Sequence, residues 1–202
     1  MIFLLNSLDK NYQTKIIKDL SKIISKSPFF TPTLPRFNNP FKIKISNAGK
    51  WGWVSNVSGY QYVREHPITN KKWPKIPKSL LFLWQKHCCK INLPDSCLIN
   101  LYSFPNSSLG IHQDKNEKDL TNPVLSISLG SNAIFRYGEN KNKLNEICLK
   151  SGAICMLKGS SRLYYHGVKK IQKVKKNIID TCDFDCFPKD CRINITLRKF
   201  EF

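Results

Sequence analysis

The stretch RINITLR, residues 192–198, alternates strictly between polar and aliphatic side chains. In an extended strand successive side chains point to opposite faces, so Arg192, Asn194 and Arg198 share one face and the aliphatic residues share the other. A surface strand would show the same pattern. Two arginines and an asparagine on one face would equally suit a dicarboxylate, because each guanidinium can pair with a carboxylate through two charge-assisted hydrogen bonds. The stretch therefore predicts a β-strand whose polar face is either solvated or part of a ligand site.

Short segments with strand character lead up to this stretch from about Ser96 onward. Asn100 and Tyr102 place an amide and a phenol on one face of the first segment, where they could line the same cavity as the arginines. Turn residues separate the segments and helical patterns precede them, which favours a β-sandwich or jelly roll flanked by helices. The predicted strands are residues 97–103, 124–130, 133–137, 147–157, 162–166 and 192–200.

Two helices are predicted in the first half of the chain. Apolar residues recur at helical spacing among lysines and serines in residues 11–26, and residues 77–90 look like a second helix. Four prolines interrupt regular structure in residues 27–40, which we expect to be a connector. Aromatic and β-branched residues with Gly and Asn turns favour strands in residues 41–65. At 202 residues, the chain is expected to fold as one domain.

Two histidines and an aspartate form a candidate metal site. His112 and Asp114 are two residues apart, so on an extended segment they point to the same side, and His166 could complete one face of an octahedron. The opposite face would stay open for oxygen and a co-substrate. Zinc and copper suit such ligands as well as iron does, because divalent-metal affinity does not favour Fe(II). A dicarboxylate site on the polar face of residues 192–198 favours iron.

The chain is strongly basic, with a formal net charge of +19. This charge suits a polyanionic partner such as nucleic acid, because neutralising phosphates releases condensed counterions. A general compositional bias toward lysine would produce the same charge. Only six of the 33 basic residues are arginine, and three of these, Arg162, Arg192 and Arg198, fall in the segments discussed here. A planar fork of donors is what distinguishes arginine from lysine.

No membrane span or secretory signal is expected. The apolar run of residues 1–5 is too short for either, and we expect a cytoplasmic protein. Without a secretory signal, the eight cysteines are expected to stay reduced. Cys182, Cys186 and Cys191 are spaced too irregularly for a standard zinc motif.

Several ordered motifs resemble the AlkB-type Fe(II)- and 2-oxoglutarate-dependent oxygenases, which repair alkylated nucleic acids. The resemblance implies a single dioxygenase domain over residues 1–202, with a nucleotide-recognition lid at about 45–76 and a double-stranded β-helix, or jelly roll, at about 96–200. The matching stretches are CLINLY (97–102), HQDK (112–115), SISLG (126–130), SRLYYHG (161–167) and RINITLR (192–198), with GW (52–53), GYQY (59–62) and TNKKWP (69–74) upstream.

This resemblance assigns a role to each residue of the candidate site. It implies that His112, Asp114 and His166 bind Fe(II). It further implies that Arg192, with help from Tyr102, binds the remote carboxylate of 2-oxoglutarate. Arg198, Asn194 and Asn100 would contact the end of the co-substrate that is chelated to the metal.

The resemblance also implies contacts to a nucleotide. Trp53 occupies the position that stacks on the damaged base, and Tyr60 and Tyr62 lie near the nucleotide backbone. Without the resemblance, such aromatic residues would be assigned to the core. Arg162 and Asn116 are expected at the substrate. The lysine run at residues 169–176 is expected either near the mouth of the site or in a solvated loop.

One residue departs from the family pattern. Members closest to this pattern often carry an acidic residue two positions after the metal aspartate, where this chain has Asn116. An amide oxygen can accept a hydrogen bond from the lesion's amino group, but it offers no charge to a cationic methylated base. Glu117 follows and would supply that charge if it faced the lesion.

The reaction implied is oxidative demethylation of 1-methyladenine and 3-methylcytosine in DNA, preferably single-stranded, with 2-oxoglutarate and O2 as co-substrates. Its products are formaldehyde, succinate and carbon dioxide, and the enzyme is expected to be a monomer. The same chemistry on RNA or protein is the first alternative, because no residue identifiable in the sequence reads a 2′-hydroxyl. A non-catalytic nucleic-acid-binding module is the second.

Overall fold

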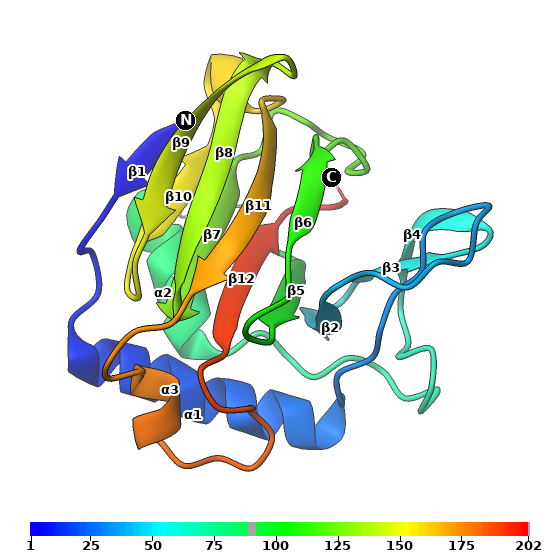
Figure 1. Ribbon diagram of the computed structural model, residues 1–202. Coiled ribbons are helices and arrows are strands. Elements are labelled where there is room, and N and C mark those ends of the chain that lie inside the picture. Colours follow the sequence, from blue (N-terminus) through cyan, green and yellow to red (C-terminus); the bar gives the residue numbers. More distant parts are fainter. Residues whose placement is uncertain (89–91, 202) are drawn as a thin grey trace.

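Two antiparallel sheets lie face to face in the computed structural model, which describes residues 1–88 and 92–201 (Figure 1). The six-stranded sheet runs in the order β1 (Ile2–Leu4), β10 (Ile154–Leu157), β7 (Val124–Gly130), β12 (Arg192–Arg198), β5 (Ser96–Tyr102) and β2 (Lys44–Gly49). The four-stranded sheet runs in the order β6 (Leu109–His112), β11 (Tyr165–Gln172), β8 (Asn132–Asn140) and β9 (Lys143–Leu149). This is the expected double-stranded β-helix.

A separate two-stranded hairpin projects to one side of the sheets (Figure 1). It consists of β3 (Gly52–Asn56) and β4 (Gly59–Val63), and its strands are not paired with either large sheet. Trp53 and Tyr62 are direct cross-strand partners in this hairpin. The strands expected within residues 41–65 are therefore present, and the preceding connector contains only isolated bridges such as Phe30 with Ile45.

Helices cover the outer face of the six-stranded sheet. They are α1 (Lys10–Lys26), α2 (Lys78–His87) and α3 (Ile178–Thr181), and a 3-10 turn spans Gly159–Ser161. Asp9 caps α1 by accepting a hydrogen bond from the backbone N–H of Tyr12 at 2.7 Å. The predicted helix at residues 77–90 corresponds to α2, and its last two predicted residues lie outside the described residues. None of the helices in the described chain has the length and apolar run needed to cross a bilayer.

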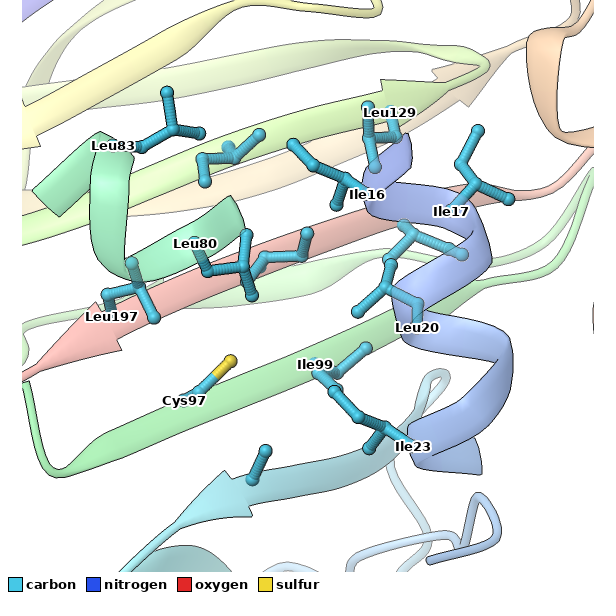
Figure 2. Packing of buried hydrophobic residues seen from close by; sticks show 14 of the residues in the cluster. Ile16, Ile17, Leu20, Ile23, Leu80, Leu83, Cys97, Ile99, Leu129 and Leu197 are labelled. Atoms are coloured by element: carbon cyan, nitrogen blue, oxygen red, sulfur yellow. The ribbon is translucent and has the colours of Figure 1, made fainter. Parts of the chain in front are cut away.

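The apolar faces of these helices form one core with the sheet. Figure 2 shows Ile16 and Leu20 of α1 and Leu80 of α2 packed over Ile99 of β5 and Leu197 of β12. All five side chains are fully buried. Burying a large aliphatic side chain is worth about 1.5–3 kcal/mol, so the periodic apolar residues of α1 hold that helix on the sheet.

The position of β12 in the middle of its sheet decides whether the polar face of residues 192–198 is solvated or buried. Ile193, Ile195 and Leu197 point to the helices, whereas the polar residues point into the space between the two sheets. That polar face is buried, since Arg192 is 1% and Arg198 is 7% exposed. The alternative of a solvated surface strand is therefore wrong for β12.

Two predicted strands differ from the structure by more than a few residues at one end. Residues 147–157 are two strands, β9 and β10, because the chain turns at Gly152, which has a φ of +84°. The predicted strand at residues 162–166 begins only at Tyr165 and continues to Gln172, because Arg162 belongs to a turn in which its N–H donates to Gly159 O at 3.0 Å. Strands β1 and β6 and helix α3 were not expected from the sequence.

Candidate active site

The predicted metal ligands converge at one edge of the four-stranded sheet. His112 ends β6 and is the direct register partner of His166 on the neighbouring strand β11. Asp114 follows two residues after β6 and points back to both rings. Its Oδ1 lies 3.7 Å from His112 Nε2, and its Oδ2 lies 3.6 Å from His166 Nε2. In the described part of the chain, these three residues are the only group of His, Cys, Asp or Glu side chains whose ligand atoms gather closely enough for a metal ion.

Backbone carbonyls fix the tautomer of both histidines. His112 Nδ1 lies 2.9 Å from Gly110 O, and His166 Nδ1 lies 2.9 Å from Tyr164 O. A carbonyl oxygen can only accept, so each Nδ1 carries the hydrogen and each Nε2 keeps its lone pair. Two imidazole nitrogens and one carboxylate on the same side are the donor set of non-haem Fe(II) oxygenases. The residues present therefore fit iron.

The electrostatics of the site prepare these groups for a cation. Burial would raise the pKa of Asp114, but the charge of Arg198, followed by the two histidines and Arg162, holds that pKa well below its usual range. Burial lowers the pKa of His166 to about 4, against the attraction of Asp114. At neutral pH the carboxylate is ionised and this imidazole is neutral, which are the forms that bind metal.

A cavity of about 260 Å³ extends from these ligands between the two sheets. Arg192 lies at one end, with its guanidinium 5.0 Å from the centre of the Tyr102 ring. One nitrogen, Nη2, donates to Ser128 Oγ at 2.9 Å, whereas the buried Nε and Nη1 have no hydrogen-bond partner among residues 1–88 and 92–201. Unpaired buried donors are rare and costly, and a carboxylate would satisfy both at once. The cavity therefore offers a carboxylate site of the kind that 2-oxoglutarate requires.

Three further polar residues of β12 and β5, which are Asn100, Asn194 and Arg198, line the same cavity as Arg192 and the metal ligands. Asn100 and Asn194 are register partners, and Asn100 Nδ2 lies 3.4 Å from Asn194 Oδ1. Arg198 donates from Nη2 to Asp114 Oδ1 at 2.9 Å. All three residues line the cavity, so Arg198 reaches both the metal ligand and the space for a co-substrate.

An aromatic pair lines the same cavity from the β3–β4 hairpin. The rings of Trp53 and Tyr60 stack at 5.6 Å with an interplanar angle of 21°. Asn47 fixes the backbone of Trp53, donating to its carbonyl and accepting from its N–H, both at 3.0 Å. Tyr60 is 47% exposed, and the exposed Asn116 also lines the cavity. These residues mark the entrance of the cavity.

Two residues expected at the substrate make hydrogen bonds within the protein. Arg162 is 4% exposed and uses all three guanidinium nitrogens within the protein, donating to Asn122 O, Asp114 O and Glu117 Oε2 at 2.8, 2.6 and 3.0 Å. Tyr62 donates to Glu117 Oε1 at 2.6 Å and stacks on Phe200 at 4.1 Å. Neither lines the cavity. Both side chains are instead engaged with Glu117, close to Asp114.

Glu117 does not supply the charge that Asn116 lacks. Its side chain is 1% exposed and is bound by Arg162, Arg198 and Tyr62. The carboxylate is thus engaged within the protein and does not line the cavity, so the condition for Glu117 to compensate for Asn116 is not met. No sequence signal indicated this role, because Glu117 lies in an irregular segment between β6 and β7.

The lysine run of residues 169–176 is divided between strand and loop. Lys169 pairs with Glu146 at 2.9 Å and Lys173 pairs with Asp190 at 2.7 Å. None of these lysines lines the cavity. Surface ion pairs of this kind contribute little to stability, so the run is best described as a partly neutralised basic surface.

Comparison with known proteins relates the whole chain to one group of enzymes. Residues 1–198 match the model of the 2OG-Fe(II) oxygenase superfamily. The alpha-ketoglutarate-dependent dioxygenase AlkB homolog of Caulobacter vibrioides (strain NA1000 / CB15N) is 36% identical over 194 residues, covering 95% of this chain and 84% of the relative. For the alpha-ketoglutarate-dependent dioxygenase AlkB of Escherichia coli (strain K12), the identity is 34% over 195 residues, covering 94% and 85%. The solved structure of OsALKBH1 superposes with a TM-score of 0.80 at 26% identity, covering 98% of this chain and 97% of that one.

Proposed function

Because this chain belongs to the AlkB family of 2-oxoglutarate- and Fe(II)-dependent dioxygenases, we propose that it repairs DNA by oxidative demethylation of 1-methyladenine and 3-methylcytosine. Iron, 2-oxoglutarate and O2 follow from the family and from the donor set of His112, Asp114 and His166. What we propose beyond the family is the lesion, 1-methyladenine or 3-methylcytosine, and the nucleic acid, DNA.

The reaction assigns a task to each part of the cavity. His112, Asp114 and His166 would hold Fe(II), and Arg192 with Tyr102 would hold the remote carboxylate of 2-oxoglutarate. When bound, the metal supplies an oxidation in which 2-oxoglutarate and O2 become succinate and carbon dioxide, while one oxygen atom enters a C–H bond of the N-methyl group. The resulting hydroxymethyl group leaves the ring nitrogen as formaldehyde, and the unmodified base is restored.

The protein side chains position these reactants and keep the metal ligands in the protonation states that bind a metal. Arg198 keeps Asp114 ionised and in place, and the carbonyl contacts of the two histidines keep their Nε2 atoms available. Arg192 would hold the co-substrate at a fixed angle through two hydrogen bonds. No general base is required, because the methyl C–H bond is broken by the oxidation and not by a protein group.

The aromatic pair on the hairpin is the observation that carries the choice of a nucleobase. Trp53 and Tyr60 line the same cavity as the metal ligands. An enzyme that reacts with a base edge must take that base out of its stack, and an aromatic ring can then replace the lost stacking. Unpaired bases cost less to extrude, which supports a preference for single strands. The net charge of +19 supports a polyanionic partner.

We propose a monomeric enzyme that acts on methylated single-stranded DNA in the cytoplasm, with the β3–β4 hairpin serving as its nucleotide-recognition lid. A panel of oligonucleotides that differ in one methylated base tests the substrate. Succinate and formaldehyde should form with DNA that contains 1-methyladenine or 3-methylcytosine, and matched unmethylated DNA should give neither at that rate. Faster turnover of the matched methylated RNA would overturn the choice of DNA. Binding of the oligonucleotides without any succinate would leave only a nucleic-acid-binding module.

A further inference from the structure

One buried carboxylate that the proposed reaction does not use links two parts of the site. Glu117 lies three residues after Asp114, and its side chain is 1% exposed. Its Oε1 accepts from the Tyr62 hydroxyl at 2.6 Å and from Arg198 Nη1 at 3.3 Å, and its Oε2 accepts from Arg162 Nη2 at 3.0 Å. A carboxylate this deeply buried is stable only when such partners are in place.

Each partner of Glu117 also contacts either the metal ligand Asp114 or the β3–β4 hairpin. Arg198 donates from Nη2 to Asp114 Oδ1 at 2.9 Å, and Arg162 donates from Nη1 to the backbone oxygen of Asp114 at 2.6 Å. Both the side chain and the backbone of the acidic metal ligand are therefore fixed by arginines that Glu117 orders. Tyr62, on the other side, is the cross-strand partner of Trp53 in the β3–β4 hairpin.

The hairpin needs such a connection. Its two strands pair with each other and with neither large sheet, and a two-stranded hairpin is marginally stable by itself. Its orientation over the cavity thus depends on contacts to the rest of the chain, among them the hydrogen bonds of Asn47 to the Trp53 backbone and that of Tyr62 to Glu117. The hydroxyl of Tyr62 makes its contact to a buried ion network, where a hydrogen bond to a charged group is stronger than one between neutral groups.

We infer that Glu117 is a positioning residue that couples the β3–β4 hairpin to the metal ligand Asp114. Through Tyr62 on one side and Arg198 on the other, a change in the hairpin moves the carboxylate that binds the metal, and occupation of the metal site restrains the hairpin. Coupling of this kind is reciprocal, so a nucleotide on Trp53 and a metal on Asp114 strengthen each other's binding. The nucleotide half of this statement rests on the proposed function, and the metal half does not.

Hydrogen exchange tests the metal half without any nucleic acid. Mn(II) is a suitable probe because it takes the same nitrogen and oxygen ligands without starting the reaction. Adding Mn(II) to the full chain should slow amide exchange in residues 59–63 of the wild-type protein, and Tyr62→Phe should abolish that slowing. Tyr60→Phe is the matched control, because it removes a hydroxyl from the same strand that makes no hydrogen bond to another described residue. Equal slowing in Tyr62→Phe and the wild type would overturn the inference.

Binding measurements test the nucleotide half. The Mn(II) affinity of the wild type should tighten on the order of 5-fold when a methylated oligonucleotide is present, and Tyr62→Phe should remove most of that gain. Glu117→Gln keeps the shape of the side chain but loses its charge, and it should weaken Mn(II) binding even without oligonucleotide. An unaltered 5-fold gain in Tyr62→Phe would contradict the coupling. If the wild type binds no methylated oligonucleotide, the proposed substrate is wrong, whereas the exchange experiment still decides whether Tyr62 connects the hairpin to the metal site.

Discussion

Arg198 donates from Nη2 to Oδ1 of Asp114 at 2.9 Å, although the two residues come from opposite sides of the jelly roll. The acidic metal ligand is therefore held by a buried cation before any metal binds. This contact lowers the pKa of Asp114 against the effect of burial, so the carboxylate stays ionised. It also fixes the position of Asp114 relative to the cavity that Arg192 lines. Metal and co-substrate sites are thus joined through the polar face of one strand, β12.

Arg192→Lys should weaken 2-oxoglutarate binding by roughly 10- to 100-fold, because a lysine cannot replace two hydrogen bonds that are each worth about 1.5–3 kcal/mol to a charged group. Titration calorimetry with the metal-loaded protein measures this loss. Arg136→Lys is the control, since Arg136 is a half-exposed arginine of β8 paired with Glu146. Unchanged 2-oxoglutarate affinity in Arg192→Lys would remove Arg192 from the co-substrate site.

Arg192→Met should leave the metal-free protein at least as stable as the wild type. Two buried donors of Arg192 have no hydrogen-bond partner in the described part of the chain, and replacing a buried cation that has no anionic partner by an apolar side chain removes its desolvation cost. Thermal unfolding of both proteins without ligands checks this. A clear fall in melting temperature would show that Arg192 stabilises the fold by itself and is not reserved for a ligand.

Trp53→Ala should raise the concentration of methylated oligonucleotide needed for half-maximal turnover, because stacking on a base is worth roughly 1–3 kcal/mol. The affinity for 2-oxoglutarate should not change. Phe82→Ala is a suitable control, since Phe82 is an exposed aromatic residue of α2, the helix on the outer face of the six-stranded sheet. Should Trp53→Ala and Phe82→Ala behave alike, Trp53 has no role in substrate binding.

Asn116→Asp should favour cationic lesions. A carboxylate at the entrance of the cavity would attract 1-methyladenine, and an exposed charge pair is worth up to about 1 kcal/mol, or on the order of 5-fold in kcat/KM. Turnover of a neutral methylated base should gain nothing. Asn142→Asp adds the same charge in the turn between β8 and β9 and controls for the net charge of the protein. An equal gain for cationic and neutral bases would contradict a contact with the lesion.

The stability of the metal-free protein should depend on His166 at acidic pH. Burial lowers the pKa of His166 from its ordinary 6.5 to about 4, so between these values the unfolded chain binds a proton that the folded protein does not. The free energy of unfolding therefore falls as pH falls from about 6.5 to about 4, by up to about 3 kcal/mol. Denaturant unfolding of the wild type and His166→Gln at several pH values tests this. A stability difference that stays constant with pH would contradict it.

The sequence predicted the parts of the fold that depend on regular patterns. The strict alternation of residues 192–198 and the apolar period of residues 11–26 correspond to β12 and α1. Alternation could not decide whether the polar face of β12 is solvated, because a cavity wall and a wet surface have the same period. Its burial depends on the second sheet, which includes β6, a strand of four residues with a glycine that has no recognisable pattern.

The candidate site was predictable where residue type alone limits the chemistry. His112, Asp114 and His166 meet as expected, and Arg192 and Tyr102 lie together across paired strands. Side chains in irregular segments were not predictable in this way. Arg162 and Glu117 become partners because a turn before β11 and the segment after β6 are folded against each other, which no local spacing encodes.

The proposed reaction is tested most directly by measuring succinate and formaldehyde from methylated single-stranded DNA with the wild type, His112→Ala and Asp114→Ala. The wild type with Fe(II), 2-oxoglutarate and air should release both products in equal amounts, and a metal chelator should stop the reaction. Both variants should lose turnover by orders of magnitude while still binding the oligonucleotide weakly, because phosphate contacts are separate from the metal. Turnover retained in both variants, or no succinate from the wild type, would contradict the assignment of the metal site and its chemistry.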